Sequence, residues 1–268
     1  MSNLVYFAIG YNDKFIDVVN LAIRYFRLKN PTIAVMVICD ESFMEKCANT
    51  LPRDTLLFSV PNTTDTTEAT LNKLRIFDAI QNTNFKRIMY IDSDILVDRN
   101  IDSILYEVKN EEKLYAFYEN SLIESHNNIN WSLKNYSEAY LEFFRERKIY
   151  VFNTGLFAFM NTPQMKEHFK NTIELIESYK DEEHFLEQSG MNVYFNKRDL
   201  VDGSLITSEV YNMYYPFDER CRNKIIHFAG SPGKDDYKIG SMRHFMVNFL
   251  LDRIVCPSCS CNFVLQKV

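Results

Sequence analysis

The sequence lacks an uninterrupted run of about 18 apolar residues, the minimum for a membrane-spanning helix. The N-terminus also lacks a basic segment followed by a long apolar one, which is the pattern of a secretory signal. From these two absences we expect a chain without a transmembrane segment, located in the cytoplasm.

An excess of positive charge is missing as well. The 30 basic residues are outnumbered by 36 acidic ones, which gives a formal net charge of −6. Broad electrostatic binding to nucleic acid or to anionic membrane needs the opposite balance. We therefore expect no nucleic-acid partner, although a local basic pocket is compatible with this composition.

The cysteines do not form the framework of a small disulfide-stapled protein, so we expect reduced thiols. Three are scattered and three crowd the C-terminal end: Cys39, Cys47, Cys221, Cys256, Cys259 and Cys261. The last three could bind zinc, but a structural zinc site usually needs about four ligands and no fourth stands beside them. We interpret residues 255–268 as a loose tail.

The chain is long and apolar enough for a sizeable core. Its 268 residues are 46% hydrophobic and 14% aromatic, which suits one large globular domain. Strand-like and helix-like segments alternate along the first half, so the pattern predicts an α/β fold with a parallel sheet. We expect strands near residues 4–9, 33–39, 56–60, 88–91, 114–118, 150–160 and 225–228, and helices near 15–25, 65–80, 163–179 and 184–196.

The segment 85–97 is the most informative. Ile88 to Ile91 form a short apolar block, which indicates a strand buried on both faces, and Asp92 and Asp94 follow it. Residues two apart in an extended chain point to the same side, so the two carboxylates are expected together. Such a pair repels itself unless a hard divalent ion sits between them. The alternative is an ordinary Asp-rich turn.

Residues 119–148 interrupt the alternation with a polar stretch that includes the only tryptophan, Trp131. We interpret this stretch as an insertion over the site, with a plain surface excursion as the alternative. Three later features also have an ordinary structural explanation. Gly155 could pack against a helix, Glu187 and Gln188 could be exposed helix residues, and His227 could be a satisfied core histidine.

Taken together, the segments resemble glycogenin and its relatives, the family 8 glycosyltransferases, as far as about Arg253. The resemblance rests on segments that stand in the family's order: Ile9-Gly-Tyr-Asn-Asp13, Asn72-Lys-Leu74, Tyr90-Ile-Asp-Ser-Asp-Ile-Leu-Val97, Phe152-Asn-Thr-Gly-Leu-Phe157, Glu187-Gln188 and His227-Phe-Ala-Gly230 with Lys234. Glu187 stands where the family usually has Asp. The resemblance implies a single-domain GT-A type fold over residues 1–254, with a mostly parallel, Rossmann-like sheet flanked by helices.

The resemblance also implies a function and a set of site residues. It implies retaining transfer of a hexose, glucose or galactose, from a UDP-sugar to a glycan, protein or small-molecule acceptor. Manganese, with magnesium as the alternative, would be held by Asp92, Asp94 and His227. The donor would contact Ile9, Tyr11, Asn12, Lys73, Ser93, Gly230 and Lys234, and the reacting centre would contain Glu187, Gln188 and Asn153.

Three other functions stay open at this point. A glycogenin-like primer would glucosylate itself, with candidate acceptors Tyr194, Tyr211, Tyr214 and Tyr215. A UDP-sugar-binding protein without turnover is compatible with Glu187. An aspartyl-nucleophile phosphatase fits least, because its motif continues to Thr or Val where this chain has Leu96. A homodimer is compatible with the sequence.

Overall fold

The computed structural model describes residues 2–123, 138–179, 187–212, 219–228, 240–243 and 245–246. The elements of the first half are β1 (Ser2–Ile9), α1 (Phe15–Lys29), β2 (Ala34–Asp40), α2 (Met44–Thr50), β3 (Leu56–Val60), α3 (Thr66–Leu71), the 3₁₀ helix η2 (Asn72–Arg75), α4 (Ile76–Ala79), β4 (Phe85–Ile91), β5 (Ile95–Val97) and α5 (Asp102–Glu107). Those of the second half are β6 (Leu114–Leu122), α7 (Glu138–Arg147), β7 (Tyr150–Met160), α8 (Pro163–Ser178), α9 (Glu187–Lys197), β8 (Val201–Asp202), β9 (Val210–Asn212) and β10 (Ile225–His227).

Seven strands form the central sheet in the order β3-β2-β1-β4-β7-β6-β8. The first four are mutually parallel, whereas β7 runs antiparallel to both of its neighbours. A smaller sheet has the order β5-β10-β9. This architecture confirms the mostly parallel, Rossmann-like α/β fold expected for the sequence.

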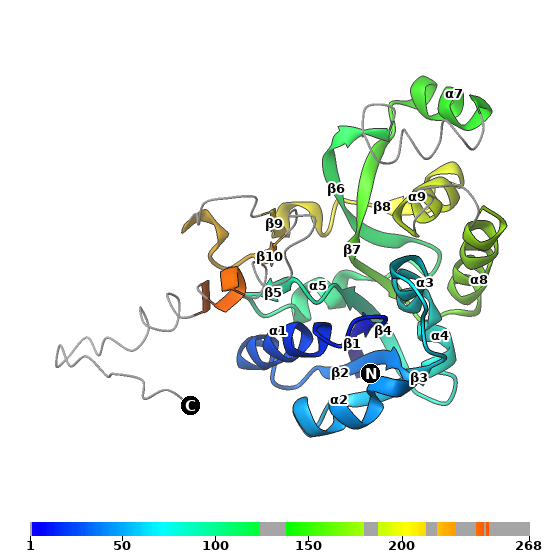
Figure 1. Cartoon of the computed structure of the whole chain (residues 1–268). Helices are drawn as coiled ribbons and strands as arrows, with labels where there is room; N and C mark the ends of the chain where they lie inside the picture. The colour runs from blue at the N-terminus through cyan, green and yellow to red at the C-terminus, as the bar shows by residue number, and fades with distance from the viewer. Residues whose placement is uncertain are drawn as a thin grey trace.

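Two hydrophobic cores cover the two faces of the sheet, because neighbouring residues of a strand point to opposite faces. Along β1, Val5 and Phe7 belong to the core shared with α1, whereas Leu4 and Tyr6 belong to the core shared with α8 and α9. Figure 1 shows α1 on one side of the sheet and α8 and α9 on the other. Each fully buried Val, Leu or Phe stabilises this arrangement by roughly 1.5–3 kcal/mol.

The strand β4 lies between β1 and β7. Ile88, Met89, Tyr90 and Ile91 are each at most 1% exposed. This burial confirms that the apolar block at 88–91 is a strand covered on both faces. The polar residues that follow it therefore emerge directly from the core.

Local capping explains where two helices begin. Asp65 caps α3 by accepting a hydrogen bond from Glu68 N at 2.8 Å, as the 65–68 segment predicts. Thr162 caps α8 by accepting from Met165 N at 3.1 Å, and Pro163 occupies the first helical turn. Both caps satisfy amide groups that a helix start leaves without partners.

The stretch 119–148 is partly regular. The strand β6 continues to Leu122, which pairs with Tyr150 of β7, and α7 covers Glu138–Arg147. Residues 124–137, with Trp131, lie outside the described residues, so an insertion over the site stays a prediction. The C-terminal tail at 255–268 lies outside them too. Within the described part of the chain, no helix has the length and hydrophobicity needed to cross a membrane.

Candidate active site

The carboxyl ends of β1, β2 and β4 meet at one edge of the sheet, since these strands are parallel and in register. Gly10 to Asn12 follow β1, and Asp92 to Asp94 follow β4. The antiparallel strand β7 brings Asn153 to Gly155 to the same edge, because Leu156 pairs with Ile91 at the end of β4. Open α/β sheets bind ligands at this kind of edge.

Asp92 and Asp94 converge, but not for the reason that the sequence suggested. The segment 92–94 is a turn, not an extended continuation of β4, and Ile95 N donates to Asp92 O at 3.1 Å to close it. Asp is favoured in turns because its side chain bonds nearby backbone groups. The turn and the paired carboxylates are therefore not alternatives, since the turn itself brings the two side chains together.

His227 completes a group of three potential ligands. One ligand atom from each of Asp92, Asp94 and His227 lies within 4.8 Å of the other two. The pairing of β10 with β5 positions the imidazole, since His227 lies opposite Ile95 and Phe228 N donates to Asp94 O at 3.0 Å. His227 Nε2 is 3.6 Å from Asp94 Oδ1.

The chemistry of this group fits a divalent metal ion. Two carboxylates and an imidazole are a donor set that suits manganese and related ions. The Nδ1 atom of His227 is buried and has no hydrogen-bond partner in the part of the chain that the structure describes. His227 is therefore not the satisfied core histidine that its strand position would ordinarily indicate.

A buried polar network supports Asp92 from the core side. Tyr90 donates its hydroxyl hydrogen bond to Asp92 Oδ1, and burial, with the adjacent Asp92 charge, raises the pKa of Tyr90 well above its usual value. Lys73 Nζ lies 3.6 Å from the same oxygen. Burial alone would lower the pKa of Lys73, but the carboxylates of Asp92 and Glu187 outweigh it and raise the pKa. The lysine therefore stays charged.

Glu187 is held by two partners at the start of α9. Its Oε1 accepts from Lys73 Nζ at 2.9 Å and from Thr154 Oγ1 at 3.0 Å. The Thr154 hydroxyl also lies 3.3 Å from Gln188 Oε1. Glu187 is only 7% exposed, so it is a buried member of the site and not an exposed helix residue.

The Asn153–Gly155 segment of β7 lies against the metal-type group formed by Asp92, Asp94 and His227. Asn153 donates to Glu119 Oε1 at 2.7 Å, and its own side-chain oxygen accepts from Gly155 N at 2.7 Å. A Cβ on Gly155 would lie 2.7 Å from Asp92 Oδ2. The glycine therefore allows close approach of the backbone to the Asp92 carboxylate and does not mark helix packing.

A cavity of about 530 Å³ opens beside these groups. Its walls include eight of the site residues expected from the sequence: Ile9, Tyr11, Asn12, Lys73, Asp92, Ser93, Asp94 and Glu187. Sequence reasoning missed a further wall, formed by Thr66, Ala69 and Thr70 of α3. Small residues on one face of a short helix give no distinctive signal, so only the fold identifies them.

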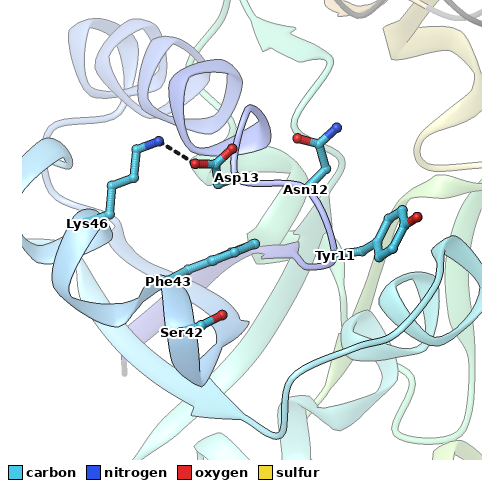
Figure 2. A pocket seen from close by; sticks show the side chains of 6 residues that line it. All are labelled: Tyr11, Asn12, Asp13, Ser42, Phe43 and Lys46. Carbon is cyan, nitrogen blue, oxygen red and sulfur yellow. Dashed lines mark hydrogen bonds and ion pairs between the residues drawn. The ribbon is translucent and has the colours of Figure 1, made fainter.

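A second cavity, of about 510 Å³, also lies at the loop after β1 (Figure 2). It is lined by Tyr11, Asn12, Asp13, Ser42, Phe43 and Lys46. Figure 2 shows Lys46 paired with Asp13, with Nζ and Oδ2 2.8 Å apart. Because Tyr11 and Asn12 line both cavities, the loop that carries them is a shared wall.

Gly230, Lys234, Tyr214 and Tyr215 lie outside the described residues. Tyr194 is only 5% exposed and its hydroxyl is 3.2 Å from His168 Nδ1 in the packing of α8 against α9, which argues against it as a self-glucosylation acceptor. Tyr211 is half-buried on β9, one residue before the strand partner of His227.

The fold is of the GT-A class, because it matches solved structures of glycosyltransferases. A crystal structure of the galactosyltransferase LgtC, in complex with donor and acceptor sugar analogs, matches 96% of this chain and 98% of its own, with a TM-score of 0.61 and 17% identity. An active-site mutant of LgtC matches equally well at 16% identity. The bifunctional glycosyltransferase WbbM covers 90% of this chain and 49% of its own, with a TM-score of 0.56 and 15% identity.

The family model for "Glycosyl transferase family 8" matches residues 20–234. This match spans most of the sequence, and the chain therefore belongs to glycosyl transferase family 8. No curated protein matches the chain.

Proposed function

We propose that this protein is a retaining glycosyltransferase that moves a hexose, glucose or galactose, from a UDP-sugar to an acceptor in a reaction that depends on a divalent metal. The observation that carries the proposal is the grouping of Asp92, Asp94 and His227 within 4.8 Å, with both aspartates on the wall of the 530 Å³ cavity. The name of LgtC, a galactosyltransferase, supports a hexose. The acceptor is a glycan, protein or small molecule.

Asp92, Asp94 and His227 would hold manganese, or magnesium in its place. Such an ion stabilises the charge that develops on a diphosphate leaving group, an effect worth roughly several kcal/mol. Ile9, Tyr11 and Asn12 would line the uracil and ribose, and Ser93 would lie near the phosphates. Gly230 and Lys234 are assigned to the phosphates by family resemblance alone.

Lys73 is proposed as a donor anchor on the cavity wall, and its contacts give it a further role. Its ammonium is 5.0 Å from the centre of the Tyr90 ring and is engaged by Glu187 and Asp92. We infer that Lys73 holds Glu187 at the cavity wall and balances the two carboxylates. Its electrostatic effect on the donor would then act over a short distance through a water-poor site.

At the reacting centre we favour attack from the same face as the departing phosphate, without a covalent intermediate. Glu187 would orient a donor hydroxyl, and Gln188 would support the positive charge that develops on the sugar, with Asn153 nearby. Both Glu187 and Gln188 contact the Thr154 hydroxyl, which supports their acting in one place. A carboxylate paired with a lysine is also a weaker nucleophile than a free one.

The reacting-centre proposal is tested with Glu187→Gln and with mass spectrometry. The variant should lose turnover while keeping its affinity for UDP, because Glu187 would act on the sugar and not on the nucleotide. Incubation with a slow donor should leave no sugar on the enzyme. A stable glycosyl adduct on Glu187 would reject same-face attack, and full activity of Glu187→Ala would remove the residue from the mechanism.

A screen of UDP-sugars tests the function as a whole. One donor, UDP-glucose or UDP-galactose, should release UDP in the presence of manganese and not in EDTA. Donor binding without any release, with or without added acceptors, would instead indicate a binding protein. Release of UDP at the same rate in EDTA as in manganese would contradict the metal requirement. Incorporation of sugar into the protein itself would favour the self-glucosylating alternative.

A further inference from the structure

Asp40 ends β2 at the same edge of the sheet and is only 2% exposed, yet no motif pointed to it. Its Oδ2 accepts hydrogen bonds from Tyr11 N at 2.8 Å, from Thr63 N at 3.2 Å and from Thr63 Oγ1 at 2.8 Å. Its Oδ1 accepts from Asn72 Nδ2 at 3.3 Å. One buried carboxylate thus joins three segments that are far apart in the sequence.

Each of these segments leads into a wall of the 530 Å³ cavity. Tyr11 belongs to the loop after β1, Thr63 precedes α3, and Asn72 stands beside Lys73 on η2. Asp40 itself is not among the lining residues of the cavity. Its contacts therefore place it behind the walls, where it acts on a ligand only through the residues that it holds.

The backbone around Asp40 is adapted to this arrangement. Tyr11 has a φ of 62°, a left-handed conformation that is uncommon for a residue with a side chain, and its amide points to Asp40. A Cβ on Gly10 would lie 2.8 Å from Asp40 Oδ1 and 2.9 Å from both Asn72 Nδ2 and Thr63 Oγ1. Only glycine leaves room for the carboxylate and its partners at this position.

The charge of Asp40 is stabilised by neutral donors. Among the described residues, no lysine, arginine or histidine forms an ion pair with it; its four hydrogen bonds come from amides and a hydroxyl. A buried carboxylate is tolerated when such bonds replace its water. Asparagine in place of Asp40 would offer only one acceptor oxygen, and its NH₂ group would face the hydrogen-bond donors that now contact the carboxylate.

We propose that Asp40 is a positioning residue for nucleotide binding: it fixes the loop Gly10–Asn12 against α3 and η2 and thereby sets the shape of the nucleotide end of the cavity. This inference rests on the proposed function, since it assumes that the cavity takes a UDP-sugar. It goes further by assigning the stability of the nucleotide pocket to a side chain that the ligand does not touch.

The test uses Asp40→Asn in the full chain, with Asp98→Asn as a matched control. Asp98 is also a buried carboxylate, 1% exposed, which accepts from Tyr25 Oη at 2.7 Å and from Asn223 N at 3.0 Å; unlike Asp40 it also forms an ion pair, with Lys29 Nζ 2.8 Å from its Oδ1. Asp98 directly follows β5, whereas Asp94 directly precedes it. Both variants should lower the melting temperature, because each removes a charged acceptor from a buried network.

Only Asp40→Asn should weaken binding of UDP, measured by calorimetry with saturating manganese on protein that is folded by circular dichroism. We expect its Kd for UDP to rise about tenfold and the KM for the donor to rise with it, while kcat changes by less than about twofold. For Asp98→Asn we expect a Kd within about twofold of the unaltered protein. A purely structural role for Asp40 would not separate KM from kcat in this way.

Each result has a defined meaning. If Asp40→Asn binds UDP as tightly as the unaltered protein, or if Asp98→Asn loses as much affinity, the inference is wrong and the proposed function stands. If the unaltered protein does not bind UDP, the proposed function fails first. Should Asp40→Asn not fold, Thr63→Val replaces it. This near-isosteric change at a half-buried residue removes one donor to Asp40, and an unchanged Kd for UDP would overturn the inference.

Discussion

At the scale of single residues, Lys73 links the metal-type group to the reacting centre. Its Nζ is 2.9 Å from Glu187 Oε1 and 3.6 Å from Asp92 Oδ1, and the side chains of Lys73 and Glu187 are 6% and 9% exposed. Breaking a buried ion pair by removing one member leaves a charge without compensation. Lys73 is therefore expected to matter for stability as well as for catalysis.

Replacing Lys73 by methionine should lower the free energy of unfolding by about 3 kcal/mol, because Glu187 and Asp92 lose their cation. The double variant Lys73→Met/Glu187→Gln should recover at least about 1 kcal/mol of that loss, since one buried charge is gone. Urea denaturation measures both values.

The matched control is Lys170→Met, which breaks an exposed i,i+4 pair with Glu174 whose side chains are 65% and 60% exposed. That change should alter the free energy of unfolding by less than about 0.5 kcal/mol. A double variant no more stable than Lys73→Met would show that Glu187 does not depend on the lysine charge.

The convergence of Asp92 and Asp94 was predictable from the sequence, but the way in which they converge was not. Asp92 and Asp94 were selected because two strand-end carboxylates need a cation, and they do converge, but through a turn and not through strand periodicity. Asp40 was not selected, because a single Asp after a strand has no distinguishing pattern. Its three partner segments become neighbours only when the sheet forms.

At the scale of elements, β7 shows how an antiparallel strand serves an otherwise parallel edge. It enters beside the end of β4, and Asp92 N donates to Gly155 O at 2.7 Å. The Asp92 carboxylate then occupies the space over Gly155. Gly155 is thus required by the close approach of the Asp92 carboxylate to the backbone of β7.

Gly155→Ala should weaken manganese binding about tenfold in the presence of UDP, since a new Cβ 2.7 Å from Asp92 Oδ2 must displace the carboxylate. Electron paramagnetic resonance of free manganese measures the affinity. Gly240→Ala is the control, because a Cβ there meets no atom of the described residues within 4 Å. Equal manganese affinity in both variants would show that the Gly155 contact does not position Asp92.

The helix α9 is where sequence patterns were least informative. Its buried residues include Glu187, Ser189, Asn192 and Asn196, which on an amphipathic helix would indicate a solvent-facing side. Asn192 instead exchanges hydrogen bonds with both backbone groups of Phe152, at 3.0 Å and 2.8 Å. Such polar burial depends on partners in another strand, and helical periodicity cannot predict it.

At the scale of the whole molecule, the fold was predictable because its signals are local and repeated. Short apolar blocks alternate with helical patterns, and β4 reads as a doubly covered strand. The strand near 225–228 is confirmed as β10, but β5 and β9 were harder to predict, since strands of three residues carry little pattern. The pairing of β10 with β5 nevertheless delivers His227 to Asp94, so the smaller sheet completes the site.

The C-terminal tail, residues 255–268, is proposed to be dispensable. Truncation after Ile254 removes Cys256, Cys259 and Cys261 and should leave the melting temperature and the rate of UDP release nearly unchanged. Differential scanning fluorimetry and the donor assay measure these two quantities. Stoichiometric zinc in the purified full-length chain that disappears on truncation would instead establish a metal site in the tail.

The central claim is that Asp92, Asp94 and His227 hold one divalent ion that assists sugar transfer from a UDP-sugar. The most direct measurement is calorimetric titration of manganese into the protein with UDP present, for the unaltered chain and for Asp94→Asn. We expect one manganese ion per chain in the first and at least a tenfold loss of affinity in the second, with the folded state kept in both. Equal manganese affinity in the two proteins would contradict the claim.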